Sequence, residues 1–194
     1  MATEILRKDV AGGSLDQIRF FITGSFSPAD AATNWTIGTP TDVVLTLAGV
    51  ATTAGRQSTK IDLGANRADE YTVLGCVDFT GETITVPGSV DYYWAPSTNT
   101  TEANGNVAGN SGADGDAPAG ALGSITLAEF LKQCQQIGSL SLHDGGSVQN
   151  GVVGTFSPMT RWGQLIVVNN CDSAFEDDDI EMHQVMNPVV LESQ

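Results

Sequence analysis

Few side chains in this sequence could act as a base or a nucleophile. The chain contains two histidines, His143 and His183, and three cysteines, Cys76, Cys134 and Cys171. A serine or cysteine nucleophile needs a base beside it, and neither histidine belongs to a recognisable catalytic motif such as GxSxG. The histidines and cysteines also lack the spacing of a zinc site. We therefore expect no enzyme, with each histidine at the surface or in a local hydrogen bond.

Carboxylates are the other candidates, since hard cations bind several carboxylate oxygens. The run EDDDIE spans residues 176–181, and the segment GADGDAPAG contains Asp114 and Asp116. Neighbouring carboxylates in a run point in different directions, and Asp114 and Asp116 lack the third ligand and the closing glutamate of an EF-hand loop. We expect a solvated loop at 176–181, and neither a metal ion nor another cofactor in the protein.

The charge balance limits the possible partners. The chain has 23 acidic and 8 basic residues, a formal net charge of −15. Binding to nucleic acid or to an anionic membrane rests largely on Lys and Arg, so we expect neither partner. An acidic surface suits solubility or docking onto a basic protein.

The cysteines and the N-terminal sequence indicate where the protein is made. An odd number of cysteines without a CxxC motif favours free thiols in a reducing cytoplasm. The N-terminal residues contain no apolar run long enough for a signal peptide, and no later segment reaches membrane-spanning length. We expect synthesis in a cytoplasm.

Short apolar stretches separated by turn residues recur along the chain and predict strands. We expect strands within residues 17–26, 42–50, 58–64, 70–79, 82–97, 138–144, 147–156, 163–170 and 180–190. One helix is expected at 126–137, with Thr126 and Glu129 forming a capping box and Gly138 ending it. The predicted fold class is an all-β antiparallel sandwich, of jelly-roll type rather than immunoglobulin-like, because the Cys…Trp…Cys spacing is missing.

Three consecutive aromatic residues, Tyr92, Tyr93 and Trp94, lie in one of these strands. Side chains alternate between the faces of a strand, so Tyr92 and Trp94 share a face. Core filling is the commoner role of a large aromatic, and we assign Trp94 to it. Tyr93 is then the more exposed ring, and it could stack on a sugar.

The domain organisation is predicted to be simple. Residues 1–16 form an N-terminal arm, and residues 17–194 form a single sandwich domain with a long polar loop at 97–120. The loop is neither a domain linker nor a metal loop, since strands flank it and the ligand spacing fails. Long excursions are uncommon in compact domains unless they are functional. We expect a contact between subunits to hold the loop.

Four phrases in a fixed order carry a resemblance to a known family. They are GRQSTKIDLGANRADEYTVLGCVDF (55–79), VDYYWAPS (90–97), VVGTFSPMTRWGQLIVVNN (152–170) and IEMHQVMNPVV (180–190). Over roughly residues 55–190 the chain resembles a group of structural proteins of the tailed-bacteriophage virion that also occur in prophages. The resemblance implies a virion component, assembled in the host bacterial cytoplasm, and it carries no catalytic signature.

The expected function is therefore a non-enzymatic virion protein that decorates or cements the capsid. It would bind the major capsid protein or other virion proteins and associate with itself as a trimer, because oligomers cover exposed sheet edges. Two alternatives stay open: a tail or baseplate adaptor or fibre-base component, and an adhesin domain that binds host glycans through Tyr93. The residues expected to contact partners are Ile5, Leu6, Arg7, Tyr93, Asn104, Asn106, Asn110, Asp114 and Asp116.

Overall fold

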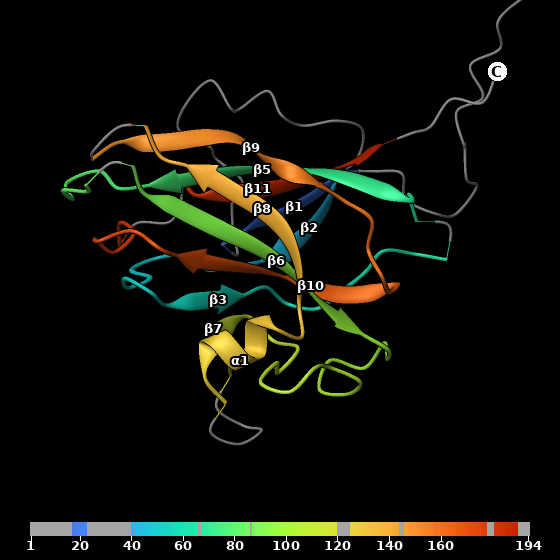
Figure 1. Cartoon of the computed structure of the whole chain (residues 1–194). Coiled ribbons are helices and arrows are strands. Elements are labelled where there is room, and N and C mark those ends of the chain that lie inside the picture. The colour runs from blue at the N-terminus through green and yellow to red at the C-terminus, as the bar shows by residue number, and fades with distance from the viewer. Residues whose placement is uncertain are drawn as a thin grey trace, which may run out of the picture.

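The computed structural model describes residues 17–22, 40–65, 67–85, 87–119, 125–143, 146–177 and 181–189. In these residues two sheets pack face to face, with one short helix beside them (Figure 1). The elements are β1 (Ile18–Phe21), β2 (Thr41–Val44), β3 (Gly55–Gln57), β4 (Ile61–Asp62), β5 (Glu70–Asp78), β6 (Ser89–Ser97), β7 (Gly115–Ala117), α1 (Leu127–Leu131), β8 (Gln135–Ser141), β9 (Val148–Phe156), β10 (Trp162–Asn169) and β11 (His183–Val189). The predicted all-β sandwich is confirmed.

The order of the strands is that of a jelly roll. The first sheet has the order β2-β1-β11-β5-β9, and the second has the order β7-β3-β10-β6-β8. Strands that follow each other along the chain repeatedly change sheets: β5 is in the first sheet and β6 in the second, and the same holds for β9 with β10. All pairs are antiparallel except β1 with β2. Without β2 and β7, the two sheets of four are those of an eight-stranded jelly roll.

The core lies between the sheets and is built around large aromatic side chains. Trp94 and Tyr92 are fully buried there, as the alternation of residues in β6 predicts. The Trp94 ring lies 5.8 Å from that of Phe156 on β9, so the two sheets share this contact. Gly163 lies beside the indole, where a Cβ would overlap the ring. A side chain at position 163 would therefore displace the largest core residue.

One polar contact crosses the core. The Tyr92 hydroxyl donates a hydrogen bond to Gln184 Oε1 at 2.7 Å, and Gln184 Nε2 donates to the carbonyl oxygen of Cys76 at 2.8 Å. A Cβ on Gly75 would overlap the Tyr92 hydroxyl. Burial raises the pKa of Tyr92 well above its ordinary value, so the phenol stays protonated and keeps donating.

Two β-bulges let the sheets meet at the edge formed by β8 and β9. Ile137 is the extra residue in the pairing of β8 with β6, and Val153 is the extra residue in the pairing of β9 with β5. A Cβ on Gly154 would lie 2.6 Å from the carbonyl oxygen of Ile137, and one on Gly138 would overlap the carbonyl of Val153. Bulges bend and twist a strand. The backbones of the two edge strands therefore touch, and only glycine fits at the contact.

The predicted helix at 126–137 is too long. Its start is correct, because Thr126 and Glu129 form the capping box, but α1 ends at Leu131. Residues 135–141 form β8 instead, and Gly138 lies inside this strand rather than ending a helix. Ile137 suits both patterns by spacing, and the core between the sheets selects the strand because the residue is buried there.

Other boundaries also differ from the predictions. The strand expected at 42–50 ends at Val44, and residues 82–85 are not in a strand. In the polar loop, residues 115–117 form β7, which pairs with β3. A two-residue strand, β4, pairs with the start of β10, and Asp62 accepts two hydrogen bonds of 2.6 Å from Arg161 at the same place. Short strands of this kind depend on their partners more than on their own sequence.

The contact between β8 and β9 gives a stability prediction. We expect Gly154→Ala to lower the free energy of unfolding by about 1–3 kcal/mol, because the new methyl group overlaps a backbone carbonyl that cannot move aside. The measurement is urea denaturation. Gly151→Ala is the matched control in the same strand, since its Cβ would meet only a flexible Leu140 methyl group at 3.1 Å. We expect a change below about 1 kcal/mol there. Equal effects of the two variants would contradict the close contact.

Candidate functional site

The polar segment after β6 forms an ordered structure on the outer face of the second sheet. We call residues 98–119 the loop platform. It lies beside α1, below β3 and β6 in Figure 1. The predicted contact residues Asn104, Asn106, Asn110, Asp114 and Asp116 all lie in it. It is therefore the part of the described chain where the sequence predictions converge.

Lys60 holds the first half of the loop platform. Its Nζ donates hydrogen bonds to the carbonyl oxygens of Thr101 at 2.7 Å, Asn104 at 2.8 Å and Asn99 at 3.2 Å. An ammonium group has three donors, and all three are used here. Partial burial lowers the pKa of Lys60, while the charge of Glu102 opposes this shift. The ammonium thus takes the position that a bound cation could occupy in such a loop.

Arg56 holds the second half through carboxylates. Its Nη1 donates to Asp116 Oδ1 at 2.8 Å, and its Nε donates to the Thr46 carbonyl oxygen at 3.0 Å. Asp114 lies on the other side, with Oδ2 3.8 Å from Nη2 of Arg56. Asp114 also accepts hydrogen bonds from the backbone N–H and the hydroxyl of Thr46, at 2.9 and 2.8 Å. The two aspartates therefore bind the protein's own groups.

Buried amides lie beneath the platform. Gln57 on β3 is fully buried, and its Nε2 donates to the Ala113 carbonyl oxygen at 2.9 Å and to Ser111 Oγ. The backbone N–H of Lys60 donates to the carbonyl oxygen of Gly112 at 2.8 Å. Gly112 has a φ of +88°, and a Cβ there would overlap the Glu102 carbonyl. Only glycine fits this position, because it is both left-handed and crowded.

An apolar cluster joins the platform, the helix and the sheet. Phe130 of α1 is fully buried against Ile166 and Val168 on the outer face of β10 and against Ala95 on β6. The half-buried Tyr93 packs against the same cluster, and burial raises the pKa of its phenol. Tyr93 is the most exposed of the three consecutive aromatic rings, as predicted, and it is half-buried because α1 and the loop platform cover this face of the sheet. Stacking of Tyr93 on a sugar stays a prediction.

The asparagines of the platform have structural roles. Asn106 Nδ2 donates to the Glu102 carbonyl oxygen at 2.8 Å, and the buried Asn110 accepts from the backbone N–H of Gly112 at 2.9 Å. Asn104 contributes its carbonyl oxygen to Lys60 and is itself exposed. These contacts lie within one chain. Contact with a partner stays a prediction. Ile5, Leu6 and Arg7 lie outside the described residues.

The two histidines lie in different environments: His143 follows the end of β8, and His183 begins β11. Nδ1 of His143 lies 2.9 Å from Gln149 Oε1. His183 is only 1% exposed, with Nδ1 3.2 Å from the Glu181 carbonyl oxygen, so it is not at the surface. It lies directly across from Cys76 on β5, which the sequence did not suggest. Cys76 Sγ donates to the same carbonyl oxygen at 3.5 Å.

Among the residues that the structure describes, no group of three or more His, Cys, Asp or Glu side chains is placed to hold a metal ion. Residues 178–180 of the acidic run lie outside the described part. Within the described ranges no helix is long and apolar enough to cross a membrane.

Comparisons with known proteins give no relative. A scan against protein-family models, a search of curated proteins and a search of solved structures each found no match.

Sequence reasoning missed the residues that hold the platform. Lys60, Arg56 and Gln57 lie in one short segment, and none was singled out. The signal that could have found them is charge: the chain has few basic residues, and two of them lie four positions apart at a strand end. Their acceptors are mainly backbone carbonyl oxygens, and these have no sequence signature.

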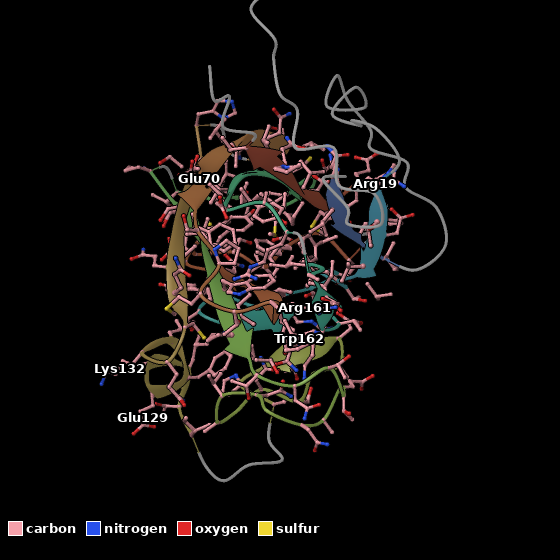
Figure 2. All side chains as sticks on the ribbon, turned by 90° about the vertical axis from the view of Figure 1, so that its right-hand side faces the viewer. Arg19, Glu70, Glu129, Lys132, Arg161 and Trp162 are labelled. Atoms are coloured by element: carbon pink, nitrogen blue, oxygen red, sulfur yellow. The ribbon has the colours of Figure 1, made fainter. Side chains whose placement is uncertain are left out.

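The role of Lys60 can be tested by removing its charge. We expect Lys60→Met to lower the free energy of unfolding by about 1–2 kcal/mol, because three carbonyl oxygens lose their donor while the aliphatic stem is kept. Hydrogen exchange should become faster in residues 98–105. Lys132→Met is the matched control, since Lys132 is exposed on α1 and points away from the sheets (Figure 2). Unchanged exchange in residues 98–105 would show that Lys60 does not hold the loop.

The cysteines give a prediction on reactivity and pH. Burial raises the pKa of Cys134 to about 12 and that of Cys171 to about 11, from an ordinary value of 9.0. We expect both thiols to react slowly with a disulfide reagent at about pH 8 in the native state, and all three cysteines to react once the chain is unfolded.

The contribution of these two thiols to the free energy of unfolding is complete below pH 9. It falls as the pH rises toward their pKa values in the folded protein, because only the unfolded chain ionises there. Fast labelling of Cys134 in the native protein would contradict its burial.

Proposed function

We propose that this protein is a non-enzymatic structural protein of a tailed-phage virion that decorates the capsid and binds the major capsid protein. The observation that carries the proposal is the loop platform: 22 residues, half of them polar, held from below by Lys60, Arg56 and Gln57. A surface that is already ordered loses little conformational entropy when it binds. It suits repeated docking on a fixed lattice of sites.

The acidic charge of the protein supports a partner with a basic surface. The Asp116 carboxylate, 85% exposed, and the exposed Glu102 both lie on the loop platform. The whole chain carries a formal net charge of −15. Complementary charge steers encounter and selects the correct partner more than it adds affinity. The capsid surface that receives this protein should therefore be basic.

The sheet edges support self-association. Among the described strands, β2 and β7 each pair on one side only. Unpaired edges favour pairing with another chain, and closed oligomers cover them. A trimer of this protein on the capsid is the arrangement we expect.

The test uses shells of the major capsid protein from the phage or prophage that encodes this chain. We expect the purified protein to sediment with these shells, and Ala103→Arg to weaken binding by about tenfold or more, because the exposed tip of the platform gains a bulky positive group. Val152→Arg is the matched control: Val152 is 65% exposed on β9, in the opposite sheet. We expect its binding to be unchanged.

The salt dependence of shell binding distinguishes an electrostatic contribution from apolar burial in the same assay. Raising the salt from about 0.05 to about 0.5 M shortens the screening length to a few ångströms and should lower the occupancy of the shells. Docking through the loop platform would be contradicted if the shells sedimented without the protein. An equal loss of shell binding in Ala103→Arg and Val152→Arg would contradict it as well. Copy number in the virion tests the tail alternative, since a tail component is present in far fewer copies.

A further inference from the structure

An open cleft lies between the loop that precedes β3 and the edge strand β7. Its volume is about 440 Å³, within the range of about 300–1,000 Å³ that is usual for binding pockets. Its wall combines the polar Thr53, Arg56 and Asp116 with small apolar residues: Ala48, Val50, Ala51, Ala54, Ala117 and Leu127. Small side chains leave room for larger ones from outside. The cleft is thus shaped to receive aliphatic side chains.

The rim of the cleft is acidic. Arg56 and Asp116 line it, and Asp114 lies beside Arg56. The exposed Asp177 lies against the cleft at Gly49, whose Cβ would be 2.8 Å from Asp177 Oδ1. Arg56 already donates to Asp116 and to Thr46. Asp114 and Asp116 therefore flank one guanidinium that is already engaged, and Asp177 adds a third carboxylate at Gly49, so an incoming cation would be attracted.

The backbone around the cleft also suits an extended segment. Among the described strands, β7 pairs only with β3, so its other edge faces no described strand. Thr53, which lines the cleft, has a φ of +60°, an uncommon conformation for a β-branched residue. Residues held in such conformations cluster at binding sites.

The N-terminal arm has the chemistry that this cleft would bind. Residues 5–8 read Ile-Leu-Arg-Lys, two large aliphatic side chains followed by two cations. The chain has only 8 basic residues, and four of the other six are engaged inside the described fold: Arg19 with Asp42, Arg56 with Asp116, Arg161 with Asp62, and Lys60 with three carbonyl oxygens. Arg7 and Lys8 are adjacent cations next to an apolar pair, which matches an apolar cleft with an acidic rim.

The geometry favours an arm from a second copy. The arm leads into Gln17, whose carbonyl oxygen accepts a hydrogen bond from Thr41 at the start of β2. Strand β2 runs parallel to β1 and leads toward the cleft, so the arm joins the fold at the end of β2 farther from it. To reach its own cleft the arm would have to turn back along the sheet.

We propose that residues 5–8 of one copy bind in the acidic cleft of a second copy and so form the contact that assembles the oligomer. This contact is a specific form of the self-association in the proposed function, and the inference rests on that self-association. It does not depend on the capsid, because the contact forms between free molecules. Loss of the contact and loss of shell binding can therefore be measured separately.

The test is sedimentation of the full-length protein over a wide range of concentrations, without shells. We expect self-association of the native chain, weakened by about tenfold or more in the arm variant Arg7→Glu with Lys8→Glu and in the cleft variant Asp116→Lys. Combining the arm and cleft variants reverses both charges, so association should largely return. Asp172→Lys is the matched control, because it reverses the charge of an exposed carboxylate that follows β10 and lies outside the described strands and the cleft. We expect no effect on association there.

A second cleft variant keeps the test valid if Asp116→Lys fails to fold. Ala51→Trp fills the cleft from an exposed position and leaves the ion pairs intact, so it should also weaken association while thermal unfolding stays cooperative. The proposal is overturned if the native chain is monomeric throughout, if the combined variant associates no better than the single ones, or if the cleft is protected from hydrogen exchange in a monomer. The last result would place the arm in its own cleft. Shell binding by a chain that does not self-associate would overturn this inference and leave the proposed function standing.

Discussion

The loop platform keeps its shape because two cations from one short segment hold it from below. Lys60 binds three backbone carbonyl oxygens of its first half, and Arg56 binds Asp116 in its second half. Each cation lies at or after β3, which pairs with the central strand β10. The polar loop is thereby tied to the rigid interior of the second sheet. The surface we assign to docking depends on this attachment.

Other cations of the fold also connect separate segments through ion pairs. Arg19 joins β1 to β2 through Asp42, and Arg161 joins β10 to β4 through Asp62. In a chain with 23 acidic and 8 basic residues, each such cation connects segments that are distant in sequence. Among the described residues, several acidic side chains, such as Glu102 and Asp177, are exposed, where they favour solubility and basic partners.

The strand pattern was predictable because alternation is a local property. The faces of β5 and β6, and the burial of Tyr92 and Trp94, follow directly from a period of two. The length of the helix was not predictable, because Ile137 continues the local helical spacing of Phe130 and Cys134, and only its burial between the two sheets favours the strand. The ordered conformation of the loop platform was also not predictable from the sequence, because Lys60 binds backbone carbonyl oxygens, which every residue has. The partner contacts of the loop stay predictions.

A reconstruction of the virion that we propose to contain this protein is the most direct test of docking on the capsid through the loop platform. We expect density for the jelly roll at regular positions on the shell, with residues 98–119 against the major capsid protein and the outer face of the first sheet turned away. Density confined to the tail, or a loop platform that faces solvent, would contradict it.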